Sequence, residues 1–304
     1  MKVLFVASFN KHRFAPFIVE QADALRRAWC EVDFFGVQGK GVKGYLKALP
    51  LLKQRIKAYH PDVIHAHYGL CGLLAGLQRR VPVVTTYHGS DINLKKNRPF
   101  SRIAMSLSKY NIFVSRKTME IASPKKKHAL IPCGIDLSEL QLTQKQDARK
   151  QMNLDEHRRY VLFAGAFDNA VKNANLAKEA VSMLHDVELL ELKGYSRDQV
   201  NLLMCAADAF LMTSFSEGSP QVIKEAMACG CPIVSVDVGD VAEVMEGVDG
   251  CYVVQRNRDE IAEKLSDFFE YYGRTEGRLR ISELELTNDV VVKKLMTIYD
   301  RCIR

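Results

Sequence analysis

Short apolar runs alternate with helical patterns along the first half of the chain. The runs predict strands over residues 3–7, 32–35, 63–65, 83–86 and 112–114. Apolar residues at helical spacing predict helices over 17–29 and 45–59. Such alternation is typical of βαβ units with a parallel sheet, so we predict an α/β domain.

The same alternation begins again after the polar stretch 141–159. It predicts strands over 160–164, 187–192, 209–212 and 233–236, with helices over 176–184, 199–206, 220–228 and 261–272. A last amphipathic helix is predicted over 289–303. The chain of 304 residues is long enough for two domains. We therefore expect domains over 1–145 and 146–285, and a C-terminal helix within 286–304.

Charge is distributed unevenly between the two halves. Residues 1–150 contain 26 Lys and Arg against 10 Asp and Glu, a net charge of +16, whereas residues 151–304 contain 17 against 26, a net charge of −9. A basic half attracts anions, and we expect an anionic membrane surface or a lipid-linked phosphate. No nucleic-acid partner is expected, because the basic clusters 79–80 and 125–127 lack aromatic side chains that stack on bases.

The first residues and the cysteines favour a cytoplasmic protein, with peripheral attachment to the inner face of a membrane. The opening apolar stretch is shorter than that of a signal peptide, and no run reaches the roughly 20 apolar residues of a membrane helix. The eight cysteines match neither zinc nor redox spacing, so we expect them to be reduced.

The strongest candidate for a binding site is the segment 214–230, SFSEGSPQVIKEAMACG, directly after a predicted strand. We expect Ser219 to cap a helix, Pro220 to occupy its first position and Gly230 to end it. The amide groups at such a helix start, together with the helix dipole, favour a diphosphate.

Two carboxylates of this segment, Glu217 and Glu225, do not fit a glycoside hydrolase. In that class two carboxyl groups flank one bond at about 5 to 9.5 Å. Eight helical residues correspond to about 12 Å along the axis, and both acids approach from one element. A capped helix with two surface acids would explain each residue singly, but it explains poorly the bare backbone of Gly218 beside a carboxylate. The two acids fit opposite ends of an extended ligand better.

These residues resemble the donor-binding motif of the retaining family 4 glycosyltransferases, the group 1 glycosyl transferases of GT-B fold. The resemblance rests on the seven-residue spacing of the two glutamates within EGSPQVIKEAMACGCPIVSVDVGDVAEV. It extends, in the expected order, through PDVIHAHYGL, VPVVTTYHGSDIN, IPCGIDLSEL and VLFAGAFDNAVKNANLAKEA. It implies two Rossmann-like domains facing each other across a cleft, with the C-terminal helix packed back on the N-terminal domain.

The resemblance also implies an activity and site residues. A hexosyl or related residue would pass, with retention of configuration, from a nucleotide diphosphate-sugar such as a UDP-sugar to a hydroxyl of a glycan or lipid-linked acceptor, as in polysaccharide biosynthesis. The catalytic residues would be His88 at the reacting sugar, Glu217 at its hydroxyls and Lys172 at the diphosphate. The donor-binding residues would be Gly165, Gly194, Tyr195, Gly218, Ser219, Pro220, Gln221, Val222 and, at the ribose, Glu225. The acceptor side would comprise Asn10, His67, Ser90 and Asp91.

The sequence departs from the family pattern at two places. Relatives usually carry an arginine shortly before the lysine that matches Lys172, but residues 165–171 contain none, so one of two expected cations at the leaving group is missing. Either a basic residue from elsewhere replaces it, or donor affinity or turnover is weak. The first loop contains Ser8, Phe9 and Asn10 in place of a common glycine pair, which affects the acceptor side.

No cofactor or metal is expected, since the nucleotide-sugar is a substrate. His65 and His67 point to the same side of a strand, but partners for zinc are not apparent and no DxD sequence is present. We expect both histidines at a loop edge on the cleft wall.

Other classes of protein fit less well. A nicotinamide dehydrogenase would need a GxGxxG sequence after the first strand, which is absent. A sugar-nucleotide epimerase would produce epimerised donor without an acceptor. A non-catalytic sugar-nucleotide-binding module would bind the donor without turnover. The last two remain as alternatives.

Overall fold

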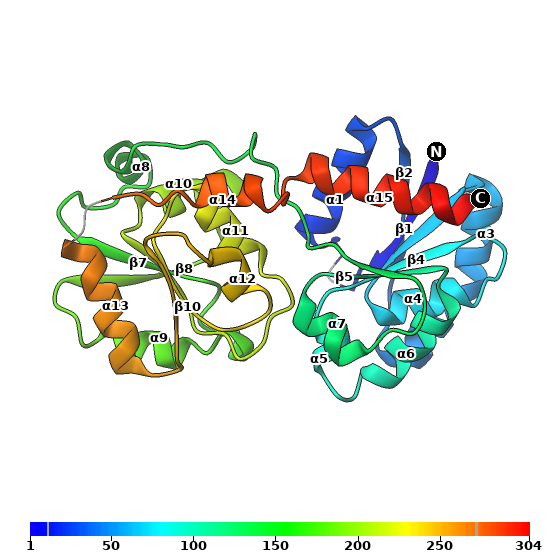
Figure 1. Ribbon diagram of the computed structural model, residues 1–304, viewed down its shortest axis with the longest axis horizontal. Coiled ribbons are helices and arrows are strands. Elements are labelled where there is room, and N and C mark those ends of the chain that lie inside the picture. Colours follow the sequence, from blue (N-terminus) through cyan, green and yellow to red (C-terminus); the bar gives the residue numbers. More distant parts are fainter. Residues whose placement is uncertain (11, 271–272) are drawn as a thin grey trace. The chain divides into compact units, whose positions relative to one another are not determined.

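The computed structural model describes residues 1–10, 12–270 and 273–304, which form two compact units (Figure 1). Unit 1 comprises Met1–Gly134 and Asn288–Arg304, and unit 2 comprises Ile135–Thr287. The first boundary thus falls after residue 134, earlier than the expected residue 145. The chain re-enters unit 1 at residue 288.

Unit 1 is built on a parallel sheet with the strand order β2-β1-β3-β4-β5-β6. The strands are β1 (Lys2–Ser8), β2 (Glu31–Val37), β3 (Val63–His67), β4 (Val83–Tyr87), β5 (Tyr110–Phe113) and β6 (His128–Leu130). The helices are α1 (Pro16–Arg27), α2 (Gly41–Leu46), α3 (Leu49–Tyr59), α4 (Gly69–Gly76), α5 (Ser90–Asn93), α6 (Arg98–Leu107), α7 (Arg116–Ala122) and α15 (Asn288–Ile303). The central strands β3 and β4 are buried throughout, as expected for a parallel sheet covered on both faces.

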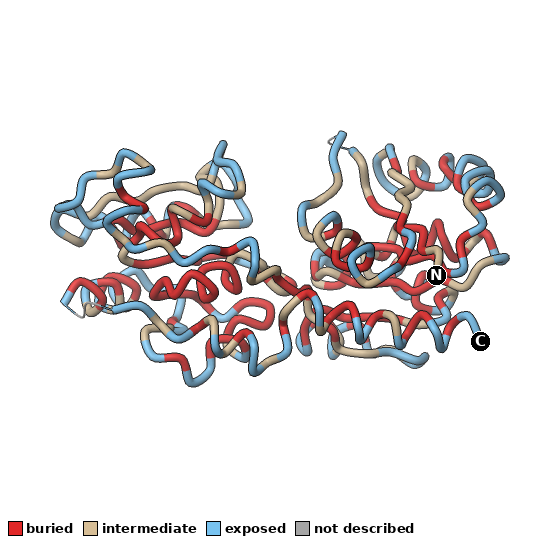
Figure 2. Tube along the Cα trace, turned by 90° about the horizontal axis from the view of Figure 1, so that it is seen from above, coloured by how far each residue is buried: buried red, intermediate tan, exposed pale blue. Residues whose placement is uncertain are grey.

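The C-terminal helix α15 packs against α1 within unit 1 (Figure 1). Leu295, Ile298 and Tyr299 join a core cluster with Ile18 and Leu25 of α1. Its buried side is visible in Figure 2 as buried segments alternating with exposed ones. The expected packing of this helix on the N-terminal domain is confirmed.

The helix predicted over 45–59 is wrong in one respect, because the structure has two helices there. Helix α2 ends at Leu46 and α3 begins at Leu49, with Pro50 in its first turn. Proline lacks an amide hydrogen and its ring clashes with the carbonyl group four residues earlier, so a helix breaks before it.

Unit 2 contains a second parallel sheet with the order β11-β10-β9-β7-β8. The strands are β7 (Arg159–Phe163), β8 (Val187–Glu191), β9 (Ala209–Met212), β10 (Ile233–Val236) and β11 (Cys251–Val254). The helices are α8 (Lys145–Gln151), the 3-10 turn η1 (Ala170–Lys172), α9 (Ala174–Val181), α10 (Arg197–Ala206), α11 (Gln221–Ala228), α12 (Val241–Met245), α13 (Arg258–Glu270) and α14 (Gly277–Glu283). The predicted strands are confirmed; Tyr272, the predicted end of a helix, lies outside the described residues.

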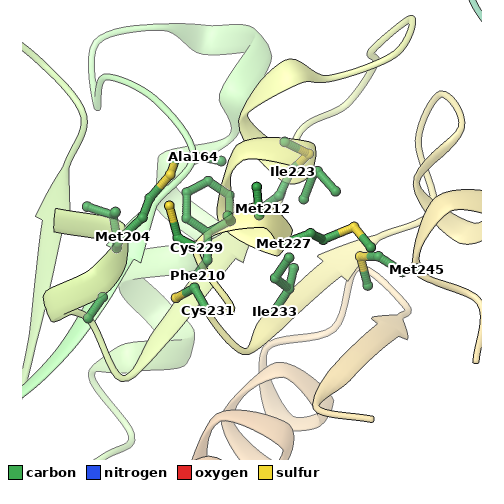
Figure 3. Close-up of a cluster of buried hydrophobic side chains, with 14 of the residues drawn as sticks. Ala164, Met204, Phe210, Met212, Ile223, Met227, Cys229, Cys231, Ile233 and Met245 are labelled. Carbon is green, nitrogen blue, oxygen red and sulfur yellow. The ribbon is translucent and has the colours of Figure 1, made fainter. Parts of the chain in front are cut away.

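The core of unit 2 holds α11 firmly against the sheet. Figure 3 shows Met227 and Cys229 of the α11 region packed with Phe210 and Met212 of β9 and Ile233 of β10. Because these side chains are fully buried, the start of α11 has a fixed position relative to the strand ends.

Candidate functional site

In unit 2 the loops after β7 and β9 are joined at the carboxyl ends of the strands, where ligands bind in such folds. The Thr213 hydroxyl donates to the carbonyl oxygens of Lys172 (3.0 Å) and Asn173 (2.9 Å). The Phe215 amide donates to the Val171 carbonyl oxygen at 2.9 Å. Two segments that are distant in sequence therefore form one continuous surface.

Two of the predicted catalytic side chains contact each other on this surface. Lys172 Nζ lies 2.7 Å from Glu217 Oε1, and the two side chains are 17% and 19% exposed. Gly165 lies beside the lysine, since a Cβ atom there would be 3.0 Å from Lys172 Cγ. The structure thus brings Gly165, Lys172 and Glu217 together, with the cation and the carboxylate neutralising each other.

Glu225 forms a second ion pair with a residue that the sequence did not single out. Arg197 Nη1 donates to Glu225 Oε1 at 2.6 Å, and the glutamate side chain is 5% exposed. Arg197 begins α10, which a capping box of Ser196 and Gln199 initiates. It follows Tyr195 by two residues and Gly194 by three, and this proximity to predicted nucleotide-binding residues could have pointed to it.

The start of α11 differs from the prediction. The helix begins at Gln221, and Pro220 stands before it in an extended conformation. Ser219 does not cap it: its hydroxyl donates to Asp240 Oδ2 at 2.6 Å and accepts from Lys224 Nζ at 2.7 Å. The charged Lys224 ammonium is a stronger donor than a backbone amide, and the Asp240 carboxylate is a strong acceptor, which explains why the hydroxyl bonds these two groups and not the helix. Gln221 and Val222 still occupy the first turn, whose amide groups have no partner within the helix, and Gly218 lies in the loop before it.

Gly230 ends α11 as predicted. Its φ angle is +66°, a left-handed conformation that glycine adopts without strain. The Cys229 amide donates to the Glu225 carbonyl oxygen at 3.0 Å to close the last turn.

At the carboxyl ends of β3 and β4 in unit 1, three histidine rings are stacked. The ring centroids of His65 and His67 are 4.4 Å apart, and those of His67 and His88 are 5.4 Å apart. His67 Nδ1 lies 3.1 Å from His88 Nε2, and the other nitrogen of His88 lies 3.7 Å from Cys133 Sγ. Both ring nitrogens of the predicted catalytic His88 are therefore engaged within unit 1.

Burial keeps these histidines neutral. It lowers the pKa of His65 and of His88 to about 3, and it lowers the pKa of His67 well below its ordinary value. His65 lies 2.6 Å from the Tyr299 hydroxyl and 2.7 Å from Thr86 Oγ1. The expectation of a loop edge is wrong for His65, which lies inside β3, whereas His67 is the last residue of that strand; both side chains are buried.

Asp91 joins the two loops that carry these rings. Its carboxylate accepts hydrogen bonds from the amide groups of Gly69 (2.9 Å), His88 (3.1 Å) and Gly89 (3.0 Å). Burial raises the pKa of Asp91 to about 6, although these hydrogen bonds oppose the shift. Ser90, at the start of α5, is exposed. Of these two residues predicted for the acceptor side, Asp91 uses its carboxylate to hold backbone amide groups, and Ser90 is exposed to solvent.

Asn10 holds the first loop against the segment after β2. Its Nδ2 donates to the Gly39 carbonyl oxygen at 2.9 Å, and its Oδ1 accepts from the Gly39 amide at 2.7 Å. Phe9 packs on Gly36, where a Cβ atom would lie 2.7 Å from Phe9 Cβ. The loop that lacks the glycine pair is therefore held against β2 and the segment after it by contacts of Phe9 and Asn10. The sequence did not predict these contacts.

The described parts of the chain contain no group of three or more His, Cys, Asp or Glu side chains suited to a metal ion. Within the same residues, no helix combines the length and the hydrophobicity needed to cross a bilayer.

Family models match both units. Residues 20–139 match the model described as Glycosyltransferase Family 4, and residues 161–270 match Glycosyl transferases group 1. The chain belongs to this family of glycosyltransferases, and its fold is GT-B.

Among curated relatives, the chain is 27% identical over 252 residues to the putative teichuronic acid biosynthesis glycosyltransferase TuaC of Bacillus subtilis, a match that covers 72% of this chain and 64% of TuaC. Sucrose-phosphate synthase from Thermosynechococcus elongatus superposes with a TM-score of 0.86 at 16% identity, over 99% of this chain and 98% of that one. HepE from Anabaena, solved with UDP-glucose, gives a TM-score of 0.77 at 18% identity, over 99% and 100%. The two structures show similarity of fold.

Proposed function

We propose that the protein transfers a sugar from a nucleoside diphosphate-sugar to a hydroxyl group of an acceptor, with retention of configuration. The observation that carries the proposal is the Lys172–Glu217 contact beside the start of α11, in a chain of this family. A cation, a carboxylate and a helix start are the groups that a sugar diphosphate needs at adjacent positions.

Donor binding exchanges partners within the site. Lys172 turns from Glu217 to the diphosphate, and Glu217 then accepts hydrogen bonds from hydroxyls of the sugar. Glu225 keeps Arg197 on one oxygen and offers the other to the ribose. Gly194 and Tyr195, which shortly precede Arg197 in the sequence, contact the nucleotide. These assignments place every charge of the ligand next to a side chain or backbone dipole of opposite sign.

Lys172 and the first-turn amide groups of α11 stabilise the charge that develops as the diphosphate leaves. The bond from C1 to the phosphate oxygen breaks with its electron pair on that oxygen. The acceptor oxygen forms its bond to C1 on the same face, and the departing phosphate takes the acceptor's proton. No metal ion is required, since the positive charge comes from the chain; unchanged transfer in EDTA checks this.

We infer a UDP-sugar as donor and a glycan or lipid-linked acceptor. The donor inference is supported by HepE, whose structure contains UDP-glucose. The acceptor inference is supported by the name of TuaC, which refers to teichuronic acid biosynthesis. The basic unit 1 favours an anionic acceptor or an anionic membrane surface, consistent with a cytoplasmic protein bound to the inner leaflet.

The test is a transfer assay with UDP-, GDP- and ADP-sugars and a panel of glycan and polyprenyl-phosphate-linked acceptors. Release of nucleoside diphosphate that depends on the acceptor, with an anomeric proton unchanged in configuration by NMR, supports the proposal. Glu217→Gln should lower the release by about 10²–10³-fold while the nucleotide still binds. Inversion of the anomeric centre would overturn retention, and release unaffected by Glu217→Gln would overturn the site.

A sugar-nucleotide-binding module is the second candidate, favoured by the absence of a basic residue in 165–171. It predicts donor binding by calorimetry with no product from any acceptor in the panel. A sugar-nucleotide epimerase would instead give epimerised donor in the absence of acceptor.

A further inference from the structure

The first turn of α11 contains a buried lysine that the proposed function leaves without a role. Lys224 Nζ donates to Ser219 Oγ at 2.7 Å and lies 3.8 Å from Asp240 Oδ2, and Ser219 Oγ donates to the same carboxylate oxygen at 2.6 Å. The Lys224 and Asp240 side chains are 1% and 5% exposed. We call these three residues the Lys224 triad.

Stability alone does not explain the Lys224 triad. Removing two charges from water costs more free energy than a buried pair usually returns, and apolar side chains of similar volume often stabilise a protein better. A cation in the first turn also opposes the positive end of the helix dipole. A methionine at position 224, together with an uncharged side chain at position 240, would fill the same space without either cost.

The triad joins the two loops that surround the start of α11. Ser219 precedes the helix and Asp240 follows β10, immediately before α12. The loops approach closely, because a Cβ atom at Gly239 would lie 2.5 Å from the Gly218 carbonyl oxygen, and Gly239 has a φ angle of +61°. The backbone before α11 is therefore held in two ways: by the charged hydrogen-bond network at Ser219, and by direct contact between Gly218 and Gly239 of the loop after β10.

We propose that Lys224 is a positioning residue for the diphosphate. Through Ser219 and Asp240 it fixes the backbone amide groups at the start of α11 in the orientation that binds the diphosphate. Amide groups that do not need to reorient stabilise charge more effectively than mobile ones, so this rigidity offsets the cation missing from 165–171. The proposal rests on the proposed function and deepens it.

Two other cations near the site, Arg197 and Arg256, have different partners. Arg197 pairs with Glu225, the residue assigned to the ribose. Arg256 Nη2 donates to the carbonyl oxygens of Ser214 (3.0 Å) and Phe215 (3.2 Å). Lys224 differs from both in its partner, because it bonds Ser219, directly before the start of α11.

The test compares nucleotides that differ only in the second phosphate. Lys224→Met alone leaves a buried carboxylate without its cation and is expected to fold poorly. Lys224→Met/Asp240→Asn removes both charges and keeps the volume. Lys264→Met/Asp267→Asn, on α13, removes a similar pair at an exposed position and serves as the control. Calorimetry measures the affinity of each protein for a nucleoside monophosphate and for the matching diphosphate. The pair is UMP and UDP, unless the wild type prefers guanosine or adenosine nucleotides.

We expect the wild type and the control to bind the diphosphate more tightly than the monophosphate. In the double variant this preference should fall at least fivefold, with monophosphate affinity and melting temperature little changed. Ser219→Ala, which keeps both charges, should lower the preference in the same way and decides the matter if the double variant does not fold. An unchanged preference in a folded variant overturns the positioning role alone. A wild type that binds no nucleotide overturns the proposed function and this inference with it.

Discussion

In each of the two units, the charge of the side chains at the carboxyl ends of the strands differs from what the net charge of the unit indicates. Unit 1 contains 27 Lys and Arg against 9 Asp and Glu, a net charge of +18, yet three neutral histidine rings lie at its strand ends. Unit 2 contains 16 against 27, a net charge of −11, yet it places Lys172, Arg197 and Lys224 around the start of α11. The charge of a unit therefore does not predict the charge at its strand ends.

The difference fits the two halves of a donor–acceptor reaction. A neutral, closely packed edge suits sugar hydroxyl groups, which need hydrogen bonds and no charge compensation. Cations held in ion pairs suit a diphosphate. Lys172 can exchange Glu217 for a phosphate oxygen, whereas Arg197 and Lys224 keep their carboxylate partners and fix the groups around it.

The largest effect is expected from the charged edge. Lys172→Met and Glu217→Gln should each lower the rate of sugar transfer by about 10²–10³-fold, the usual loss when one preorganised group at a developing charge is removed. Lys150→Met, which breaks an exposed ion pair between α8 and Glu156 in the loop that follows, should leave the rate unchanged. Steady-state kinetics with the preferred donor measures all three. A loss below threefold in both site variants would remove the charged edge from the mechanism.

The neutral edge predicts a specific pH dependence of stability. A histidine whose folded pKa lies below its unfolded value binds fewer protons when folded, so its contribution is complete above about pH 6.5 and is lost as the pH falls. Because the pKa of His65 is about 3 in the folded protein, its contribution should lower the free energy of unfolding by about 2 kcal/mol when the pH falls from 7 to 5. Asp91, whose pKa is raised to about 6, acts in the opposite direction and stabilises as the pH falls.

Urea unfolding at pH 7 and pH 5 tests this on wild type and His65→Gln, which retains a hydrogen-bonding side chain. The variant should lose less stability between the two pH values than the wild type. Equal losses would show that His65 is not held neutral by burial.

A smaller effect is expected at the nucleoside end of the charged edge. Arg197→Gln leaves the buried Glu225 carboxylate without its cation and should weaken nucleoside diphosphate binding about tenfold, the worth of one charge-assisted hydrogen bond. Thermal shift against UDP, GDP and ADP measures it, with Arg258→Gln on α13 as control. Undiminished shifts in Arg197→Gln would mean that Glu225 is held without it.

The smallest effect concerns the surface charge of unit 1. Replacing Lys125, Lys126 and Lys127 with Gln should lower the fraction of protein bound to anionic vesicles a few-fold at low salt, since each lysine near such a surface contributes about 1 kcal/mol at most. Higher salt should abolish the difference. Flotation with phosphatidylglycerol vesicles measures it. If the wild type does not float, the membrane proposal fails while the donor site is unaffected.

The pattern of apolar residues was sufficient to predict the strands and most helices. A parallel sheet covered on both faces needs apolar strands and helices with one apolar side, and both patterns can be read from a few neighbouring residues. The prediction failed where one residue changes the backbone, as at Pro50 in the first turn of α3, which ends the preceding helix. It also failed at Ser219, where the competing acceptor, Asp240, lies twenty-one residues further on.

By itself, the sequence determined the family, the order of the strands along the chain, and the loops in which Lys172, Glu217 and Glu225 stand. Only the tertiary structure decided what these residues contact: the pairing of Glu225 with Arg197, the Lys224 triad, and the histidine stack joined to Tyr299 from the C-terminal helix. The physical reason is that strand and helix preferences act over a few neighbouring residues. Burial and ion pairing depend instead on which distant segments the sheets bring to one edge.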